Sequence, residues 1–212
     1  MRLGLYVVTY ADPARGFGHM DVAAAAIEGG ADAIQLRGKE LGGRELHGLA
    51  LRMGDAIGRS PAGGLFFVND RIDVAMAAKA DGVHLGQEDV PAQAARSLMS
   101  AGMILGISAT TVEEALAARE DGADYLGVGP VFATPSKDDA APPIGLEGLK
   151  RIREAVELPI VAIGGIDADN ARRVLNAGAD GIAVISAVTG AEDMTGAVRE
   201  LRLLVDDCLA GR

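Results

Sequence analysis

The sequence predicts an α/β protein of the (β/α)8 TIM-barrel class, in which eight parallel strands alternate with eight helices. A phrase close to Gly-Ala-Asp, followed by a short apolar run, occurs four times, with its aspartates at positions 32, 81, 124 and 180. Their spacings of 49, 43 and 56 residues each fit two strand-plus-helix units of about 25–30 residues. The 212-residue chain therefore has room for eight units.

Eight apolar runs have the length of parallel strands that are buried on both faces. They lie at 3–9, 33–36, 65–68, 83–85, 104–107, 125–128, 160–163 and 181–185. Helices are expected at 20–28, 43–57, 72–78, 90–99, 112–120, 146–156, 168–176 and 193–209. Thr111 and Glu114 form a capping box for the fifth helix, and Asp167 and Asp169 favour the start of the seventh. An open doubly wound sheet is the alternative, but the evenly sized units and the missing Gly-x-Gly-x-x-Gly favour the barrel.

Composition narrows the class of protein. No linker or change of composition interrupts the chain, so residues 1–212 are expected to form one catalytic domain. The formal net charge of −10 argues against a nucleic acid or a membrane surface as partner. A single cysteine, Cys208, excludes an internal disulfide. The first apolar run is too short for a membrane span and lacks a cleavage site, which predicts a cytoplasmic protein. The sequence does not determine whether the protein forms a homo-oligomer.

The C-terminal strand ends are where such barrels place their catalytic groups. The four repeated aspartates precede their strands and are therefore assigned to turns. After the second strand, alternation sends Gln35, Arg37 and Lys39 to one side. An amide and two cations should thus converge at the barrel mouth, the alternative being solvated loop charges.

Two carboxylates follow adjacent strands, Asp70 after Asn69 and Asp89 after the fourth strand. One or two carboxylates plus substrate phosphates usually hold Mg²⁺, so Asp70 and Asp89 are the candidate metal ligands. Alternatively, both aspartates only cap the helices that follow them. Glu88 is a weaker candidate because its side chain should point away from Asp89. For His84, a packed barrel histidine is the simpler interpretation.

The segment after the sixth strand, 130–143, is long for a barrel connection and is expected to act as a lid. Within it, Thr134, Ser136 and Lys137 offer two hydroxyls and a cation to phosphate oxygens. The segment is therefore expected to contribute to ligand binding.

A second phosphate subsite is expected over the last two strands. Glycine backbone around Gly165 and amides near Ile185 and Ser186 match the phosphate pocket common in this fold. The Ser108 hydroxyl, after the fifth strand, could contact a ligand between the two subsites. This layout suits either a leaving pyrophosphate paired with a phosphorylated acceptor or a single sugar bisphosphate.

Together these motifs resemble the thiamine-phosphate synthase family over nearly the whole chain. The matching strings are Gln-Leu-Arg-Gly-Lys at 35–39, Asn-Asp at 69–70, Gly-Val-His-Leu-Gly-Gln-Glu-Asp at 82–89, Gly-Ile-Ser at 106–108, Gly-Val-Gly-Pro-Val-Phe at 127–132, Thr-x-Ser-Lys at 134–137, Ile-Gly-Gly-Ile at 163–166 and Ile-Ser at 185–186. The combination is far more specific than any one string.

The resemblance implies a Mg²⁺-dependent transferase. It would move the aminopyrimidine-methyl group of hydroxymethylpyrimidine diphosphate to the nitrogen of hydroxyethylthiazole phosphate, giving thiamine phosphate and pyrophosphate. The implied ligands of the pyrimidine diphosphate are Gln35, Arg37, Lys39, Asn69, Ser108 and Lys137. The implied ligands of Mg²⁺ are Asp70 and Asp89, and those of the thiazole phosphate are Thr134, Ser136, Gly165, Ile185 and Ser186.

The implied chemistry is a dissociative displacement, in which pyrophosphate leaves before the thiazole nitrogen attacks through its lone pair. Arg37, Lys39, Ser108 and Lys137 are the expected catalytic residues, the cations neutralising charge on the leaving group. One rival is a thiazole tautomerase-like isomerase on the same barrel, which is thought to use a histidine near strand five. Residues 108–111 read Ser-Ala-Thr-Thr instead. Another is a sensor that binds a thiazole phosphate without releasing pyrophosphate.

Overall fold

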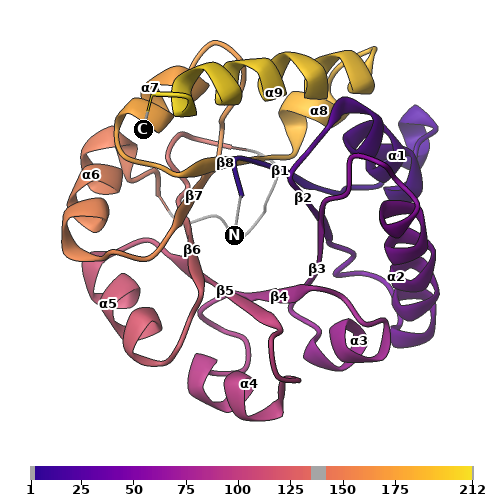
Figure 1. Ribbon diagram of the computed structural model, residues 1–212, viewed down its shortest axis with the longest axis horizontal. Helices are drawn as coiled ribbons and strands as arrows, with labels where there is room; N and C mark the ends of the chain where they lie inside the picture. Colours follow the sequence, from indigo (N-terminus) through magenta and orange to yellow (C-terminus); the bar gives the residue numbers. More distant parts are fainter. Residues whose placement is uncertain (1–2, 135–141, 212) are drawn as a thin grey trace.

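Within residues 3–134 and 142–211, which the computed structural model describes, eight parallel strands close into a barrel in chain order (Figure 1). The strands are β1 (Leu5–Val8), β2 (Ala33–Leu36), β3 (Leu65–Asn69), β4 (Gly82–Leu85), β5 (Ile104–Ala109), β6 (Tyr125–Val128), β7 (Ile160–Ile163) and β8 (Gly181–Val184). The first and last strands pair, with Tyr6 opposite Ala183, which closes the sheet. The predicted (β/α)8 barrel is confirmed.

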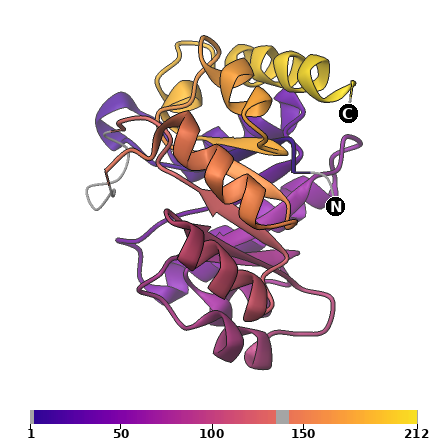
Figure 2. The ribbon, with the colours of Figure 1, turned by 90° about the vertical axis from the view of Figure 1, so that its left-hand side faces the viewer.

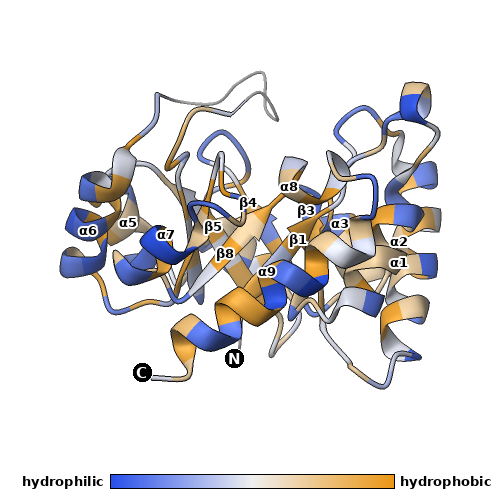
Figure 3. Cartoon of the chain, turned by 90° about the horizontal axis from the view of Figure 1, so that it is seen from above, coloured by the Kyte–Doolittle hydropathy of each residue, from blue (hydrophilic) through white to orange (hydrophobic). Residues whose placement is uncertain are grey.

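Helices surround the strands in the view down the barrel (Figure 1). They are η1 (Pro13–Arg15), α1 (His19–Gly29), α2 (Gly43–Gly58), α3 (Ile72–Ala77), α4 (Ala92–Leu98), α5 (Val112–Glu120), α6 (Gly145–Ala155), α7 (Ala171–Asn176), α8 (Ser186–Thr189) and α9 (Met194–Leu209). Apolar residues concentrate on the strands, and hydrophilic ones on the outer faces of the helices (Figure 3). The N- and C-termini lie at the same end of the barrel (Figure 2).

The starts of two helices differ from the sequence expectation by more than one residue. Helix α4 begins at Ala92 rather than at residue 90, because Pro91 stays extended at a ψ of 142° and disfavours helix in the residue before it. Helix α7 begins at Ala171, because Asp167 accepts the backbone N–H groups of 169 and 170 in a separate turn. The capping box of α5 is present as predicted, with the Glu114 amide donating to Thr111 Oγ1 at 3.2 Å.

The barrel interior is filled by aromatic rings at its middle layer. The ring centroids of Phe67 lie 5.3 Å from Tyr6 and 5.7 Å from Tyr125. A Cβ atom at Gly82 would collide with the Phe67 ring, and one at Gly106 with the Tyr125 ring. Glycine in these two strands therefore gives the large rings the room that close packing requires.

The four repeated aspartates have a more specific role than turn formation. Each stands before an even-numbered strand and accepts the backbone N–H of a residue near the start of the preceding odd-numbered strand. At 2.7–2.8 Å, Asp32 accepts from Leu5, Asp81 from Phe66, Asp124 from Leu105 and Asp180 from Ile160. Three of them also pair with the arginines 202, 96 and 153. The repeat thus closes the N-terminal end of the barrel, where strand N–H groups otherwise lack partners.

Candidate active site

A pocket of about 580 Å³ opens at the C-terminal ends of the strands, a size typical of small-molecule sites. Its lining includes these sequence-predicted residues: Arg37, Lys39, Asn69, Asp70, Asp89, Ser108, Thr134, Gly165, Ile185 and Ser186. Ser136 and Lys137 lie outside the described residues, as does half of the expected lid, residues 135–141. The structure therefore gathers the described candidates, except Gln35, around one mouth.

The basic edge of the pocket, formed by Arg37 and Lys39, is supported by the side chains of Thr9 and His19. Sequence analysis did not identify either of these two residues as a candidate. Thr9 Oγ1 accepts the backbone N–H of Arg37 at 3.3 Å and lies 2.9 Å from Nδ1 of His19. His19 is 5% exposed, and burial lowers the pKa of its imidazole below the ordinary value. A neutral His19 and Thr9 thus support the loop on which Arg37 and Lys39 stand. No sequence pattern connects Thr9 with His19.

The acidic edge brings Asp70 and Asp89 together above adjacent strands. The pKa of Asp70 is raised to about 6, first by burial and then by the neighbouring carboxylate of Asp89, while Lys39 and Arg37 partly oppose both effects. Asp70 also has a φ of 61°, which is uncommon for a residue other than glycine. Two half-buried carboxylates that repel one another form a site that a cation would stabilise.

The alternative role of these aspartates, helix capping, does not fit the geometry. Helix α3 has Arg71 at its N-cap and α4 has Pro91, and neither end carries a side-chain capping bond. Asp89 instead accepts the backbone N–H of Gly86 at 2.7 Å. Glu88, the weaker candidate, also lines the pocket, beyond the end of β4 at Leu85.

Metal coordination by protein side chains alone would need more ligands than this edge provides. In the described part of the chain, no group of three or more His, Cys, Asp or Glu side chains is placed to hold a metal ion. Two carboxylates fit Mg²⁺, which usually takes its remaining ligands from water and substrate phosphates. The chemistry of Asp70 and Asp89 thus fits Mg²⁺, and their role as its ligands stays a prediction.

The opposite side of the pocket is built from backbone. Gly164 and Gly165 have φ angles of 100° and 62°, and a Cβ on Gly165 would lie 2.6 Å from the Ala133 oxygen. Asn170 Nδ2 donates to the Gly165 oxygen at 2.9 Å and fixes this turn. Only glycine combines such a φ with such a close backbone approach. This side therefore leaves open space and backbone groups for a ligand.

Gln35 lies beneath the mouth rather than at it. Its side chain is 4% exposed, and its Nε2 donates to the Tyr6 hydroxyl at 2.9 Å inside the barrel. Alternation correctly places Gln35 and Arg37 on the same side, but two strand residues span about 6–7 Å. Gln35 is therefore one layer deeper, where it lines a smaller cavity next to the main pocket.

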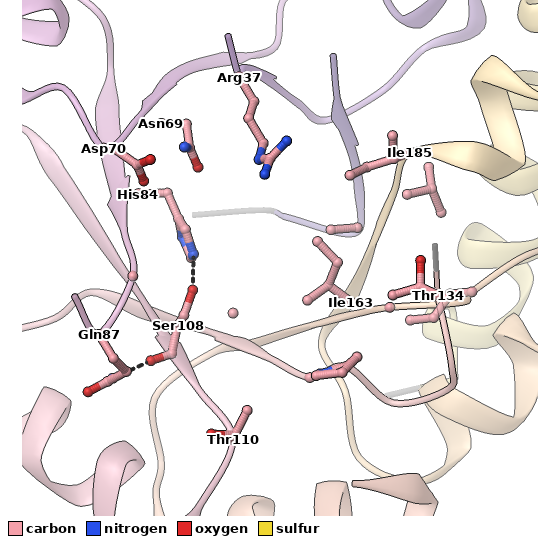
Figure 4. A pocket seen from close by; sticks show the side chains of 18 of the residues that line it. Arg37, Asn69, Asp70, His84, Gln87, Ser108, Thr110, Thr134, Ile163 and Ile185 are labelled. Carbon is pink, nitrogen blue, oxygen red and sulfur yellow. Dashed lines mark hydrogen bonds between the residues drawn. The ribbon is translucent and has the colours of Figure 1, made fainter. Parts of the chain in front are cut away.

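Ser108 and His84 line the pocket next to one another, and His84 lies beside Asp70 (Figure 4). His84 Nε2 lies 3.0 Å from Ser108 Oγ, and Gln87 Nε2 donates to the backbone carbonyl oxygen of Ser108 at 2.6 Å. His84 Nδ1 lies 2.9 Å from the Tyr125 hydroxyl. His84 is thus more than a packed histidine, because it joins the barrel interior to the pocket. The sequence missed Gln87 and Tyr125; the tyrosine reads as an ordinary apolar strand residue.

Comparisons with known proteins agree on one family. The model of the family described as thiamine monophosphate synthase matches residues 5–188. A thiamine-phosphate synthase of Moorella thermoacetica is 55% identical over 203 residues, covering 95% of each chain. One of Methanocella arvoryzae is 51% identical over 213 residues, covering all of both chains.

A solved structure is similar over almost the same span. The thiamine phosphate pyrophosphorylase from Pyrococcus furiosus superposes with a TM-score of 0.89 at 48% identity, covering 98% of this chain and 97% of that one. Separately, none of the helices in the described ranges is long and apolar enough to cross a membrane.

Proposed function

Because the chain belongs to the thiamine monophosphate synthase family, we propose that it transfers the aminopyrimidine-methyl group of hydroxymethylpyrimidine diphosphate to hydroxyethylthiazole phosphate. The products are thiamine phosphate and pyrophosphate. The chain is thus an enzyme, and its class is that of the transferases. The observation that carries the proposal is one pocket with a basic edge, a carboxylate pair and a glycine-lined side.

The leaving diphosphate belongs at the basic and acidic edges. Arg37 and Lys39 would neutralise charge as it develops on the departing oxygens, and Asn69 would orient the diphosphate. Mg²⁺, held by Asp70 and Asp89, supplies charge neutralisation for a pyrophosphate leaving group when it is bound. The electrostatic conflict between the two carboxylates would then be relieved by the ligand that the reaction requires.

The acceptor belongs on the glycine-lined side. Thr134, Gly165, Ile185 and Ser186 line this part of the pocket and would hold the thiazole phosphate. Ser136 and Lys137, outside the described residues, are expected to contact the thiazole phosphate and the diphosphate respectively. The thiazole nitrogen attacks through a lone pair, so the transfer requires no general base. Positioning and charge are the contributions asked of the protein.

Turnover by the purified protein tests the proposal. Incubation with both substrates and Mg²⁺ should give thiamine phosphate and pyrophosphate in equal amounts, and EDTA should stop both. Omitting the thiazole phosphate is the control for simple hydrolysis of the diphosphate. Folded protein that yields no thiamine phosphate would reject the proposal.

The same assay separates the rivals. An isomerised thiazole with no pyrophosphate would identify the tautomerase-like isomerase. Binding of the thiazole phosphate with no turnover would identify the sensor. The carboxylate pair favours the synthase over both, because neither rival has a diphosphate leaving group for Asp70 and Asp89 to serve.

A further inference from the structure

Five polar side chains form a continuous hydrogen-bonded chain from the barrel interior to the pocket. They come from β2, β1, β6, β4 and β5 in that order: Gln35, Tyr6, Tyr125, His84 and Ser108. The successive donor–acceptor distances are 2.9, 3.1, 2.9 and 3.0 Å. Only the last pair reaches the main pocket, where Figure 4 shows it. Such a chain in an apolar core has to satisfy every proton it contains.

The direction of the chain follows from counting protons at its buried end. Gln35 Nε2 donates to Tyr6, so the Tyr6 hydroxyl proton needs another acceptor. Among the described residues, its one remaining hydrogen-bond partner is the Tyr125 hydroxyl. Burial raises the pKa of both tyrosines well above the ordinary value, so both keep their protons. Tyr6 therefore donates to Tyr125, since an unsatisfied buried donor is costly.

The same count continues outward. A phenol has one proton, and Tyr125, which accepts from Tyr6, uses its own to donate to Nδ1 of His84. An imidazole ring that accepts a hydrogen bond at Nδ1 carries its proton on Nε2. Nε2 then donates to Ser108 Oγ. The Ser108 proton is left directed away from His84, into the pocket.

We propose that this chain fixes Ser108 as a hydrogen-bond donor toward the pocket, so that the site recognises an acceptor nitrogen of the pyrimidine ring. His84, Tyr125 and Tyr6 are positioning residues in this scheme, because they act only through Ser108. The inference rests on the proposed function, which supplies the pyrimidine. In the opposite direction Ser108 would donate to His84 and could only accept from the substrate.

The direction decides which kinetic constant the chain controls. Positive charge develops on the aminopyrimidine as pyrophosphate departs, so its ring nitrogens become poorer acceptors. A donor to such a nitrogen helps the ground state at least as much as the transition state, and its loss raises KM rather than lowering kcat. A neutral hydrogen bond of this kind corresponds to about a threefold to tenfold change.

Tyr125→Phe breaks the chain with a nearly isosteric side chain. We expect KM for the pyrimidine diphosphate to rise about threefold to tenfold, with kcat within twofold and KM for the thiazole phosphate unchanged. Tyr10→Phe is the matched control. The protein has three tyrosines, and Tyr10, which is exposed, is the one that does not belong to the hydrogen-bonded chain. This substitution should leave all three constants unchanged.

A double-mutant cycle separates positioning from packing. In Ser108→Ala, adding Tyr125→Phe should cost nothing further in KM, because the serine through which Tyr125 acts is gone. A thermal-unfolding measurement on each variant accounts for any loss of folded protein. Additive effects of the two substitutions on KM would overturn the inference, as would a loss confined to kcat.

Substitutions at His84 test the direction itself. The amide of His84→Gln can place a donor where Nε2 stands, whereas His84→Asn reaches only the Nδ1 position. We expect Gln to keep KM within about threefold of wild type and Asn to match Ser108→Ala. Equal defects in the two variants would contradict the scheme.

Nitrogen-15 NMR of histidine-labelled protein reads the tautomer without any turnover. The His84 resonances, assigned by their loss in His84→Gln, should show a proton on Nε2 and none on Nδ1, and the reverse would overturn the inference. Wild-type protein that makes no thiamine phosphate would instead reject the proposed function, whatever the tautomer.

Discussion

Aspartates at the two ends of this barrel are placed in opposite environments. At the N-terminal end, Asp124 and Asp180 each accept a strand N–H and pair with an arginine. At the C-terminal end, Asp70 and Asp89 face one another, and the pKa of Asp70 rises to about 6 through burial and through Asp89. The first arrangement stabilises the folded chain, and the second stores an electrostatic conflict.

This difference in environment distinguishes aspartates that stabilise the fold from aspartates that are available to a ligand, without any comparison with related sequences. A carboxylate with its hydrogen bonds and counter-charge supplied by the protein has little left to offer a ligand. A carboxylate pair whose negative charge is offset mainly by Lys39 and Arg37 can still accept a cation. We therefore expect stabilising contacts to be concentrated at one end and ligand binding at the other, as in barrels generally.

The largest effect that we expect is loss of activity in Asp70→Asn. Removing one charge from the carboxylate pair should lower kcat/KM for thiamine phosphate formation by about 100-fold or more. The folded protein should become more stable by about 1–2 kcal/mol after allowance for solvent screening, because a repelling, half-buried charge is lost. Steady-state kinetics and thermal unfolding check the two parts. Unchanged turnover and unchanged Mg²⁺ dependence would remove Asp70 from the metal site.

The reverse outcome is expected at the other end of the barrel. Asp180→Ala removes the acceptor of the Ile160 amide and the partner of Arg153. Urea denaturation should show a loss of about 1–3 kcal/mol in the free energy of unfolding, while kcat/KM stays within twofold at a temperature where the variant is folded. A large fall in kcat/KM of the folded variant would break the division between the two ends.

Gly165→Ala probes the neutral side of the C-terminal end. The added Cβ meets the Ala133 oxygen, and the φ of 62° disfavours alanine. KM for the thiazole phosphate should rise about tenfold, since a local strain of about 1–2 kcal/mol displaces the loop. KM for the pyrimidine diphosphate should not change. An equal rise in both KM values would mean that the two subsites are not separate.

The smallest effect concerns pH. The folded pKa of Asp70, about 6, lies above its ordinary value of 3.8, so this group's contribution to stability is present below pH 3.8 and is lost as pH rises through 6. Metal-free wild type should therefore gain up to about 1 kcal/mol relative to Asp70→Asn between pH 7 and pH 5. Parallel unfolding curves for the two proteins across this range would contradict the assignment.

The sequence predicted the fold and the membership of the pocket because both follow from local periodicity. A phrase close to Gly-Ala-Asp precedes every second strand, and chemistry-bearing residues follow the strands. The depth of a side chain within the barrel, and its contacts across the closed sheet, do not follow from the local sequence. Gln35 and Arg37 share a side but lie in different layers, and Tyr6 meets Tyr125 because the closed barrel brings β1 and β6 together across its interior.

Pyrophosphate binding in the absence of turnover tests the central claim most directly. Calorimetry on wild type, the double variant Asp70→Asn/Asp89→Asn and Asp180→Ala compares its affinity with and without Mg²⁺. Wild type and Asp180→Ala should bind pyrophosphate at least tenfold more tightly with Mg²⁺, and the double variant should show no such gain. An equal gain from Mg²⁺ in all three proteins would contradict the assignment of the C-terminal carboxylates to the metal.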